Sequence, residues 1–291
     1  CSKDLGLAGQ RIGYIAINPR IEIAGELFSA CVTTNRTLGF VNANALMQRA
    51  IRTCLDARVD MNFYAENRDI LLDALEASGA FEDTVVVVTA ENPDVFCVGT
   101  DLEEFYAFEN RAEGIALFSV ASIIDAFDCP TIAAINGDAL GQGLELALAC
   151  DLRMCSQDAT FGMPQITAGE MPWDGGTQRL ARLVGRAKAL ELILLGETID
   201  APEAHRIGLV HKVIPHNELM AVVTDLAQEM AAKSSVSLAY VKEAIHKGMD
   251  LTLKQGLRLE ADLYHLIHTT EDRTEGIKAF REKRRPQFKG K

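Results

Sequence analysis

One stretch decides the fold: it reads TIAAINGDALGQGLELALAC and covers residues 131–150. Its first residues form a short, continuous run rich in β-branched side chains, which is typical of a strand buried on both faces of a sheet. A glycine-bearing loop follows, and the remainder has the composition of a helix. The stretch therefore predicts a strand, a loop and a helix in succession.

A second run of this kind, TVVVVT at residues 84–89, leads to the glycine-bearing loop FCVGTDL at residues 96–102. Because the pattern repeats, we expect an α/β core with parallel strands whose loops gather at the carboxyl ends of the strands. Nearer the amino terminus the sequence predicts a β-hairpin and two helices, at residues 11–18 with 27–33, at 44–55 and at 70–75.

After Leu180 the sequence becomes mostly helical. Amphipathic patterns cover residues 187–195, 218–232, 238–247 and 253–268. The segment IDAP at residues 199–202 opens this part, so we place a domain boundary there. We expect a core domain over residues 1–199 and a C-terminal helical domain over residues 200–291.

The composition excludes several classes of protein. Of the 291 residues 48% are hydrophobic, so the chain buries a sizeable core. A formal charge of −12 argues against a general affinity for nucleic acid or for an anionic membrane. The dense basic cluster REKRR at residues 281–285 is either a solvated tail or a phosphate-binding segment.

Seven cysteines without paired spacing indicate free thiols in a reducing compartment. No apolar run reaches the ~18 residues of a membrane span, and the sequence shows no secretion signal. We expect a soluble cytoplasmic protein, although a chain that begins at Cys1 leaves open a targeting peptide that has been removed. His265 and His268 have the spacing of metal ligands but lack an evident third ligand, so we expect a surface or interface helix and no metal site.

The two glycine-bearing loops both end where a helix is expected. Glycine lets a ligand approach the backbone, and the first amides of a helix have no partners within it. Two such helix starts that face each other make an oxyanion hole, which would stabilise the charge that develops on a thioester oxygen. Taken singly, each loop is equally well explained as an ordinary turn between a strand and a helix.

Glu145 lies in the apolar segment LELALAC at residues 144–150, where an unpaired carboxylate is costly to bury. One interpretation is a carboxylate that the positive end of its helix stabilises. The other is a partly desolvated acid with a raised pKa, able to transfer protons near neutrality.

A third block, FGMPQITAGEMPWDGGTQRL at residues 161–180, completes a recognisable set. Together with the two loops and the segments GRAKA at 185–189, EAHRIGLV at 203–210 and EGIKAFREKR at 275–284, it resembles the crotonase (enoyl-CoA hydratase/isomerase) superfamily. The resemblance runs from about Val85 to the carboxyl terminus. The residues before it match only loosely and look as though they contain an insertion.

The resemblance implies a ββα-superhelix core, a C-terminal helical region used in trimerisation, and often a hexamer of two trimers. It also implies an acyl-CoA substrate, so that coenzyme A belongs to the substrate and no separate cofactor is needed. By position, the oxyanion amides fall on Thr100 and Gln142, the latter in place of the usual glycine, and the first catalytic glutamate falls on Glu145. The neighbouring loop residues expected to contact the substrate are Val98, Gly99, Asp101 and Gly141. The aromatic and lysine of the last helix, which a neighbouring subunit commonly supplies to coenzyme A, fall on Phe280 and Lys283.

Gln165 departs from the family pattern, because two-glutamate hydratases carry their second glutamate directly after this proline. An amide cannot take up or deliver the proton. Asp174 offers a replacement, since it resembles in position an active-site aspartate of some dienoyl-CoA isomerases and of a dehalogenase; its alternative role is to cap the helix that starts near Thr177. Glu170 is a further candidate, more simply a solvated loop acid, and Trp173 either forms a wall of the acyl pocket or packs under the loop.

We therefore predict an enoyl-CoA or dienoyl-CoA hydratase that stabilises a thioester enolate, with Glu145 and Asp174 as acid/base groups. The runner-up is a double-bond shift in an enoyl-CoA or dienoyl-CoA. Decarboxylation, dehalogenation and thioester hydrolysis use the same enolate on the same fold. A non-catalytic protein that binds coenzyme A is the alternative from another class, and Glu145 argues against it.

Overall fold

The computed structural model describes residues 13–17, 84–92, 94–100, 105, 115 and 118–291. Its main sheet has the strand order β1-β2-β4-β6-β9, and β1 alone runs antiparallel to its neighbour. These strands are β1 (Gly13–Ile17), β2 (Val85–Thr89), β4 (Thr131–Ile135), β6 (Leu152–Ser156) and β9 (Lys212–Ile214). The predicted parallel pairing of residues 84–89 with residues 131–135 is confirmed.

A second sheet of short strands has the order β3-β5-β7-β8. Its strands are β3 (Val95–Cys97), β5 (Asp138–Leu140), β7 (Thr160–Gly162) and β8 (Thr198–Asp200). Each of the first three follows a strand of the main sheet, so β2-β3, β4-β5 and β6-β7 form successive strand pairs that the chain separates by helices. This repeat is the ββα-superhelix architecture that the resemblance implies.

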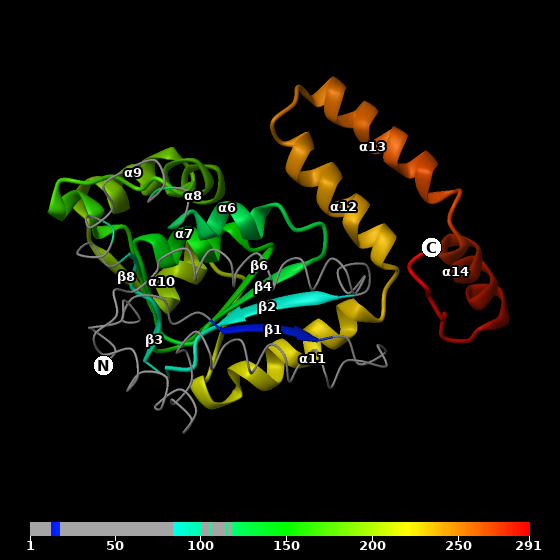
Figure 1. Cartoon of the computed structure of the whole chain (residues 1–291), viewed down its shortest axis with the longest axis horizontal. Helices are drawn as coiled ribbons and strands as arrows, with labels where there is room; N and C mark the ends of the chain where they lie inside the picture. The colour runs from blue at the N-terminus through cyan, green and yellow to red at the C-terminus, as the bar shows by residue number, and fades with distance from the viewer. Residues whose placement is uncertain (1–12, 18–83, 93, 101–104, 106–114, 116–117) are drawn as a thin grey trace, which may run out of the picture.

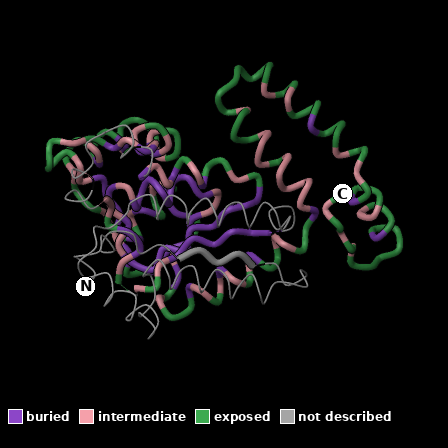
Figure 2. Tube along the Cα trace, viewed as in Figure 1, coloured by how far each residue is buried: buried purple, intermediate pink, exposed green. Residues whose placement is uncertain are grey.

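The central strands β2 and β4 of the main sheet are buried along their whole length, as their apolar runs predict (Figure 2). Side chains alternate along a strand, so Val86 and Val88 of β2 face one cluster while Val85 and Val87 face the other. The first cluster contains α6 (Val120–Asp125) and α7 (Gln142–Ala149), and the second contains α11 (Leu219–Ala231). Helix α7 is buried along nearly its whole length, which explains why its sequence is apolar throughout.

The helices expected after Leu180 are present, with slightly different bounds. They include α9 (Arg186–Leu195), α11, α12 (Ser235–Gly248) and α13 (Leu253–Ile267). The helix expected near Thr177 is α8 (Gly176–Val184), the helical part expected after residue 199 begins with α10 (Ala201–Arg206), and the expected last helix is α14 (Glu271–Glu282). Asp200 caps α10 by accepting a hydrogen bond from the Glu203 amide at 2.9 Å, so a helix does begin at the expected boundary.

The core nevertheless continues past residue 200. Strand β9 pairs in parallel with β6 at the edge of the main sheet, and α11 packs on the same sheet. The helices that project from the core are α12, α13 and α14 (Figure 1). Sequence analysis did not predict β9, because the strand Lys212–Ile214 is too short to give a periodic signal.

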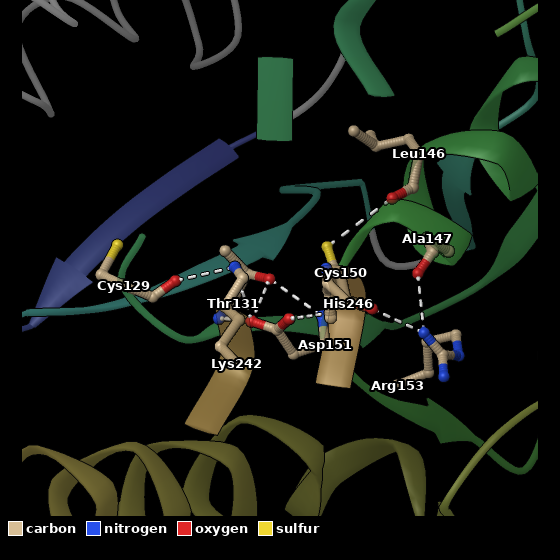
Figure 3. Close-up of polar contacts among 9 residues, drawn as sticks. All are labelled: Cys129, Thr131, Leu146, Ala147, Cys150, Asp151, Arg153, Lys242 and His246. Carbon is tan, nitrogen blue, oxygen red and sulfur yellow. Dashed lines mark hydrogen bonds and ion pairs between the residues drawn. The ribbon is translucent and has the colours of Figure 1, made fainter. Parts of the chain in front are cut away.

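A half-buried carboxylate attaches α12 to the core. Asp151 accepts hydrogen bonds through Oδ2 from the Thr131 amide at 2.7 Å and from the Thr131 hydroxyl at 2.9 Å. From α12, Lys242 Nζ lies 3.0 Å from the same oxygen, and His246 Nε2 lies 3.2 Å from Oδ1 (Figure 3). Lys242 also donates to the Cys129 carbonyl at 3.0 Å. Burial alone would raise the pKa of Asp151, but these partners outweigh it and hold that pKa below its ordinary value.

Several expectations fall outside the described residues: the strand at 27–33, the helices at 44–55 and 70–75, and Asp101. Within the described residues Cys97, Cys129, Cys150 and Cys155 are buried free thiols, and no helix is long and apolar enough to cross a membrane. His265 and His268 lie on the exposed surface of α13 and at its carboxyl end, and the described residues contain no cluster of three metal-ligating side chains.

Candidate active site

The two glycine-bearing loops meet at the start of α7. A Cβ added at Gly99 would lie 3.5 Å from the Gln142 amide nitrogen, and one added at Gly143 would lie only 1.9 Å from the Cys97 carbonyl oxygen. The end of β3 therefore packs directly on the first turn of α7, at a distance that only glycine permits. The predicted proximity of the loop around Thr100 to Gln142 is present.

The amino terminus of α7 has no capping side chain among the described residues. Its N-cap is Gly141, with a φ of 56° that favours glycine, and Gln142 is the first residue of the helix. An amide at this position has no acceptor within the helix, and the helix dipole makes its surroundings attractive to negative charge. The Gln142 amide is therefore available to an acceptor from outside the helix.

Glu145 lies in the first turn of the same helix and is fully buried, at 0% exposure. Its Oε1 accepts hydrogen bonds from the Asp174 amide at 2.9 Å and the Gly176 amide at 2.7 Å. Its Oε2 has no partner among the described residues. Burial raises the pKa of Glu145 to about 7, against the partial opposition of the two amides. The carboxyl group is therefore held at one oxygen, free at the other, and able to exchange a proton near neutrality.

The loop that holds Glu145 depends on Gly176. A Cβ added there would lie 2.8 Å from Glu145 Oε1 and 2.8 Å from Pro172 Cβ. Arg179 supports the same loop, because its Nη1 donates to the Asp174 carbonyl at 2.9 Å and its Nη2 lies 3.1 Å from Asp125 Oδ2. Sequence analysis singled out neither residue, although the GG pair at residues 175–176 already indicated a tight approach of two chain segments.

Asp174 is buried, at 2% exposure, but it does not cap the helix near Thr177. That helix, α8, has no side-chain cap among the described residues. Instead Asp174 caps α6: Oδ2 accepts from the Ala121 amide at 2.7 Å, and Oδ1 accepts from the Ser122 amide at 3.2 Å and the Ser122 hydroxyl at 2.6 Å. Asp174 does not fill the capping position predicted for it, because its side chain points to α6 and away from the helix that follows it in the chain.

Comparisons with known proteins identify the family. The enoyl-CoA hydratase/isomerase family model matches residues 51–291. The chain belongs to the enoyl-CoA hydratase/isomerase family. It is an acyl-CoA enzyme of the hydratase/isomerase type, on the crotonase fold.

Individual members of the family are similar to most of the chain. A putative enoyl-CoA hydratase/isomerase of Bacillus subtilis is 43% identical over 208 residues, which are 70% of this chain and 80% of that protein. The 2,3-dehydroadipyl-CoA hydratase of Escherichia coli is 40% identical over 76% of this chain and 87% of its own length. The crystal structure of an enoyl-CoA hydratase from Bacillus anthracis superposes with a TM-score of 0.69 at 38% identity, covering 71% of this chain and 81% of that one.

The resemblance to two-glutamate hydratases puts Gln165 where the second glutamate is expected. It lies in the short 3₁₀ helix Pro164–Ala168, and its side-chain amide is 3.5 Å from a Cβ added at Gly141. Its Oε1 is buried and has no hydrogen-bond partner among the described residues. The carboxamide therefore lies beside the start of α7, and hydrogen bonding is the only chemistry it offers there.

Trp173 packs in an aromatic cluster. Its ring stacks on Phe105 with a centroid distance of 5.8 Å, and Phe105 meets Phe118 edge-on at 5.8 Å. Sequence analysis did not single out the two phenylalanines, which lie more than 50 residues before the tryptophan. Glu170 is half-buried, and its amide donates to the Gln165 carbonyl at 3.0 Å. On the other loop, the Val98 side chain is 53% exposed.

Phe280 and Lys283 are not brought to Glu145 within one chain. They lie at the end of α14, which is remote from α7 (Figure 1). Phe280 is 85% exposed, and Lys283 is exposed and adopts the left-handed conformation, with a φ of 53°. In this family such residues are expected to reach the site of a neighbouring subunit.

Proposed function

We propose that the protein adds water across the double bond of an enoyl-CoA or dienoyl-CoA, with Glu145 as its acid/base group. The observation that carries this proposal is the state of the Glu145 carboxyl group. One oxygen is fixed by two backbone amides, the other is unpartnered, and the pKa is raised to about 7. A purely structural carboxylate would have both oxygens satisfied, as Asp174 has.

The amides of Thr100 and Gln142 would hold the thioester oxygen. When water adds to the β-carbon, negative charge develops on that oxygen as the enolate forms, and both donors then bind it more strongly. The loss of one such donor typically costs ~3 kcal/mol of transition-state stabilisation. Val98, Gly99 and Gly141 belong to the same two loops and would contact the thioester.

Glu145 moves a single proton in this mechanism. As a carboxylate it takes a proton from the water molecule while the oxygen forms its bond to the β-carbon and the carbon–carbon π electrons become the enolate. It then returns that proton to the α-carbon as the enolate collapses to the thioester. Water is consumed and Glu145 is regenerated, so the step balances without a second carboxylate.

Gln165 is compatible with this mechanism because its amide can hydrogen-bond water without transferring a proton. Its unpartnered Oε1 supports a role in holding the water molecule. Asp174 is not needed as the second acid/base group, and its three hydrogen bonds to α6 favour a structural role. Trp173 and its stacked phenylalanine would form part of the acyl wall.

A double-bond shift is the second candidate, and Gln165 is the observation that favours it. A single carboxylate can take a proton from one carbon and return it to another, and no water molecule has to be activated. We rank hydration before the double-bond shift because the resemblance places the catalytic glutamate of hydratases at Glu145.

Incubation with crotonyl-CoA and with dienoyl-CoAs in deuterated water separates these reactions. Hydration removes the enoyl-thioester absorbance and adds the mass of one water molecule, with deuterium at the α-carbon. Isomerisation leaves the mass unchanged apart from exchanged deuterium. Binding of coenzyme A without turnover of any acyl-CoA would show instead that the chain is a binding protein.

We further propose that the protein forms a trimer or a hexamer and acts in the cytoplasm. The projecting helices expose Met249, Leu253 and Phe280, which a neighbouring subunit would cover. The net charge of −12 and the buried free thiols support a reducing aqueous compartment. Sedimentation velocity tests the assembly: a monomer at micromolar concentration would contradict it.

A further inference from the structure

The Gln142 side chain joins three segments of the chain at the site. Thr100 Oγ1 donates a hydrogen bond to Gln142 Oε1, and Gln142 Nε2 donates to the Phe118 carbonyl. These contacts span 42 and 24 residues of sequence, respectively. One carboxamide therefore connects the loop after β3, the start of α7 and the segment that leads into α6.

The same two residues carry the proposed oxyanion donors. Thr100 and Gln142 are joined through their side chains, while their backbone amides would point at the thioester oxygen. The distance between two donors on separate loops is otherwise set by backbone packing alone. The bridge adds a direct link between the donors, through a hydrogen bond between two half-buried side chains.

The third contact extends this link to the aromatic cluster. Phe118 is buried, at 2% exposure, and its ring meets Phe105, which stacks on Trp173. The next helix, α6, is capped by Asp174, whose amide in turn holds Glu145. The Gln142 side chain thus links the loops that carry the proposed oxyanion donors to the aromatic cluster proposed as part of the acyl wall.

We propose that Gln142 is a positioning residue whose side chain fixes the spacing of the two oxyanion amides and ties them to the Phe118 segment. A glycine, usual at this position in the family, cannot form this bridge. The proposal deepens the proposed function and rests on it for the assignment of the two amides. Small errors of placement in such a site reduce the rate strongly, so loss of the bridge should lower kcat more than it changes KM.

Thr100→Val and Thr100→Ser form a matched pair that tests the bridge. Valine has nearly the shape of threonine, keeps the backbone amide and lacks the hydroxyl donor, whereas serine keeps the donor. We expect Thr100→Val to lower kcat roughly tenfold with KM changed less than about twofold, and Thr100→Ser to retain severalfold more of kcat than Thr100→Val. If the two variants behave alike, the hydroxyl is irrelevant and the proposal is overturned.

Gln142→Ala removes both arms of the bridge and retains the Gln142 amide. We expect a loss of kcat at least as large as that of Thr100→Val. The double variant Thr100→Val with Gln142→Ala should lose no more than Gln142→Ala alone, because both substitutions break the same hydrogen bond between Thr100 and Gln142. Independent, multiplying losses would contradict a shared bridge. If Gln142→Ala does not fold, the pair at Thr100 still decides.

A spectroscopic measurement separates this proposal from the proposed function. A bound cinnamoyl-CoA with an electron-donating ring substituent absorbs at longer wavelength when two donors polarise its thioester carbonyl. We expect Thr100→Val and Gln142→Ala to lose most of that shift and Thr100→Ser to keep it. A full shift in all three variants would overturn the bridge, whereas wild-type protein that shows the shift but turns over no enoyl-CoA would overturn only the proposed function.

Discussion

Helices α6 and α7 pack against each other, but their amino termini are treated differently. At α6, the amides of Ala121 and Ser122 donate hydrogen bonds to Asp174, which belongs to the segment at residues 161–180. At α7, Gly141 offers no side chain, and the Gln142 amide is left for another acceptor. Both ends attract negative charge. The chain's own carboxylate therefore satisfies the amides at the start of α6, whereas the Gln142 amide at the start of α7 is left available at the candidate site.

The two buried carboxyl groups repeat this contrast. Asp174 has both oxygens bonded to α6, whereas Glu145 has one oxygen bonded and the other unpartnered among the described residues. The two are joined, since the Asp174 amide donates to Glu145. Substitutions that act on one carboxyl group and spare the other therefore test whether catalysis and capping are separate.

Glu145→Gln should give the largest effect. Glutamine keeps the shape and can accept the same two backbone hydrogen bonds, but it cannot transfer a proton. We expect kcat for enoyl-CoA to fall about 10³-fold while the affinity for coenzyme A thioesters stays nearly unchanged. Single-turnover kinetics with a binding titration measures both, and retained activity would remove Glu145 from the mechanism.

The same variant should change how stability depends on pH. The pKa of Glu145 is raised from 4.5 to about 7, so the native state favours the neutral acid. This contribution to stability is complete below pH ~4.5 and is lost as the pH rises to about 7, which lowers the free energy of unfolding by up to about 3 kcal/mol. Urea unfolding at pH 5 and pH 8 should show that loss in the wild type and not in Glu145→Gln. If the free energy of unfolding changed equally between pH 5 and pH 8 in both proteins, the pKa of Glu145 would be the same in the folded and unfolded states.

Asp174→Asn should affect stability more than chemistry. The amide nitrogen of asparagine would face backbone donors that now meet a carboxylate oxygen, so we expect a loss of about 2 kcal/mol in the free energy of unfolding. The value of kcat should remain within severalfold of wild type once the protein is folded. A loss of kcat by orders of magnitude at unchanged stability would instead make Asp174 a catalytic residue.

Ser122→Ala should give the smallest effect. It removes the hydroxyl that donates to Asp174 Oδ1 at 2.6 Å, while the Ala121 and Ser122 amides keep the carboxylate bonded. We expect a loss of about 1 kcal/mol or less and no change in kcat. Thermal unfolding of this variant alone and combined with Asp174→Asn checks it, because the two losses should not add if both concern the α6 cap.

Sequence analysis anticipated the elements whose signal is local. The runs at residues 84–89 and 131–135 predicted the parallel strands because burial on both faces requires unbroken apolar side chains. Glu145 was identified because a carboxylate inside an apolar helix is costly unless it has a function or a partner. The helices after Leu180 followed from apolar periodicity.

Contacts between distant segments could not be anticipated in this way. Asp174 reaches α6 across 52 and 53 residues of sequence, and Thr100 reaches Gln142 across 42, so no local period records either contact. The best available signal was Gln142 itself, a large amide where the family usually has glycine. Strand β9 was missed for a related reason, since it belongs to the core through pairing with β6 and not through its own sequence.

The close approach of α7 to the end of β3 has a practical consequence for redesign. No side chain other than hydrogen fits at Gly143, where an added Cβ would meet the Cys97 carbonyl oxygen at 1.9 Å. Random mutagenesis for new acyl specificity should therefore find few tolerated changes on this floor of the site. Trp173 instead stacks on the ring of another side chain, Phe105, so altered substrate ranges are to be sought there.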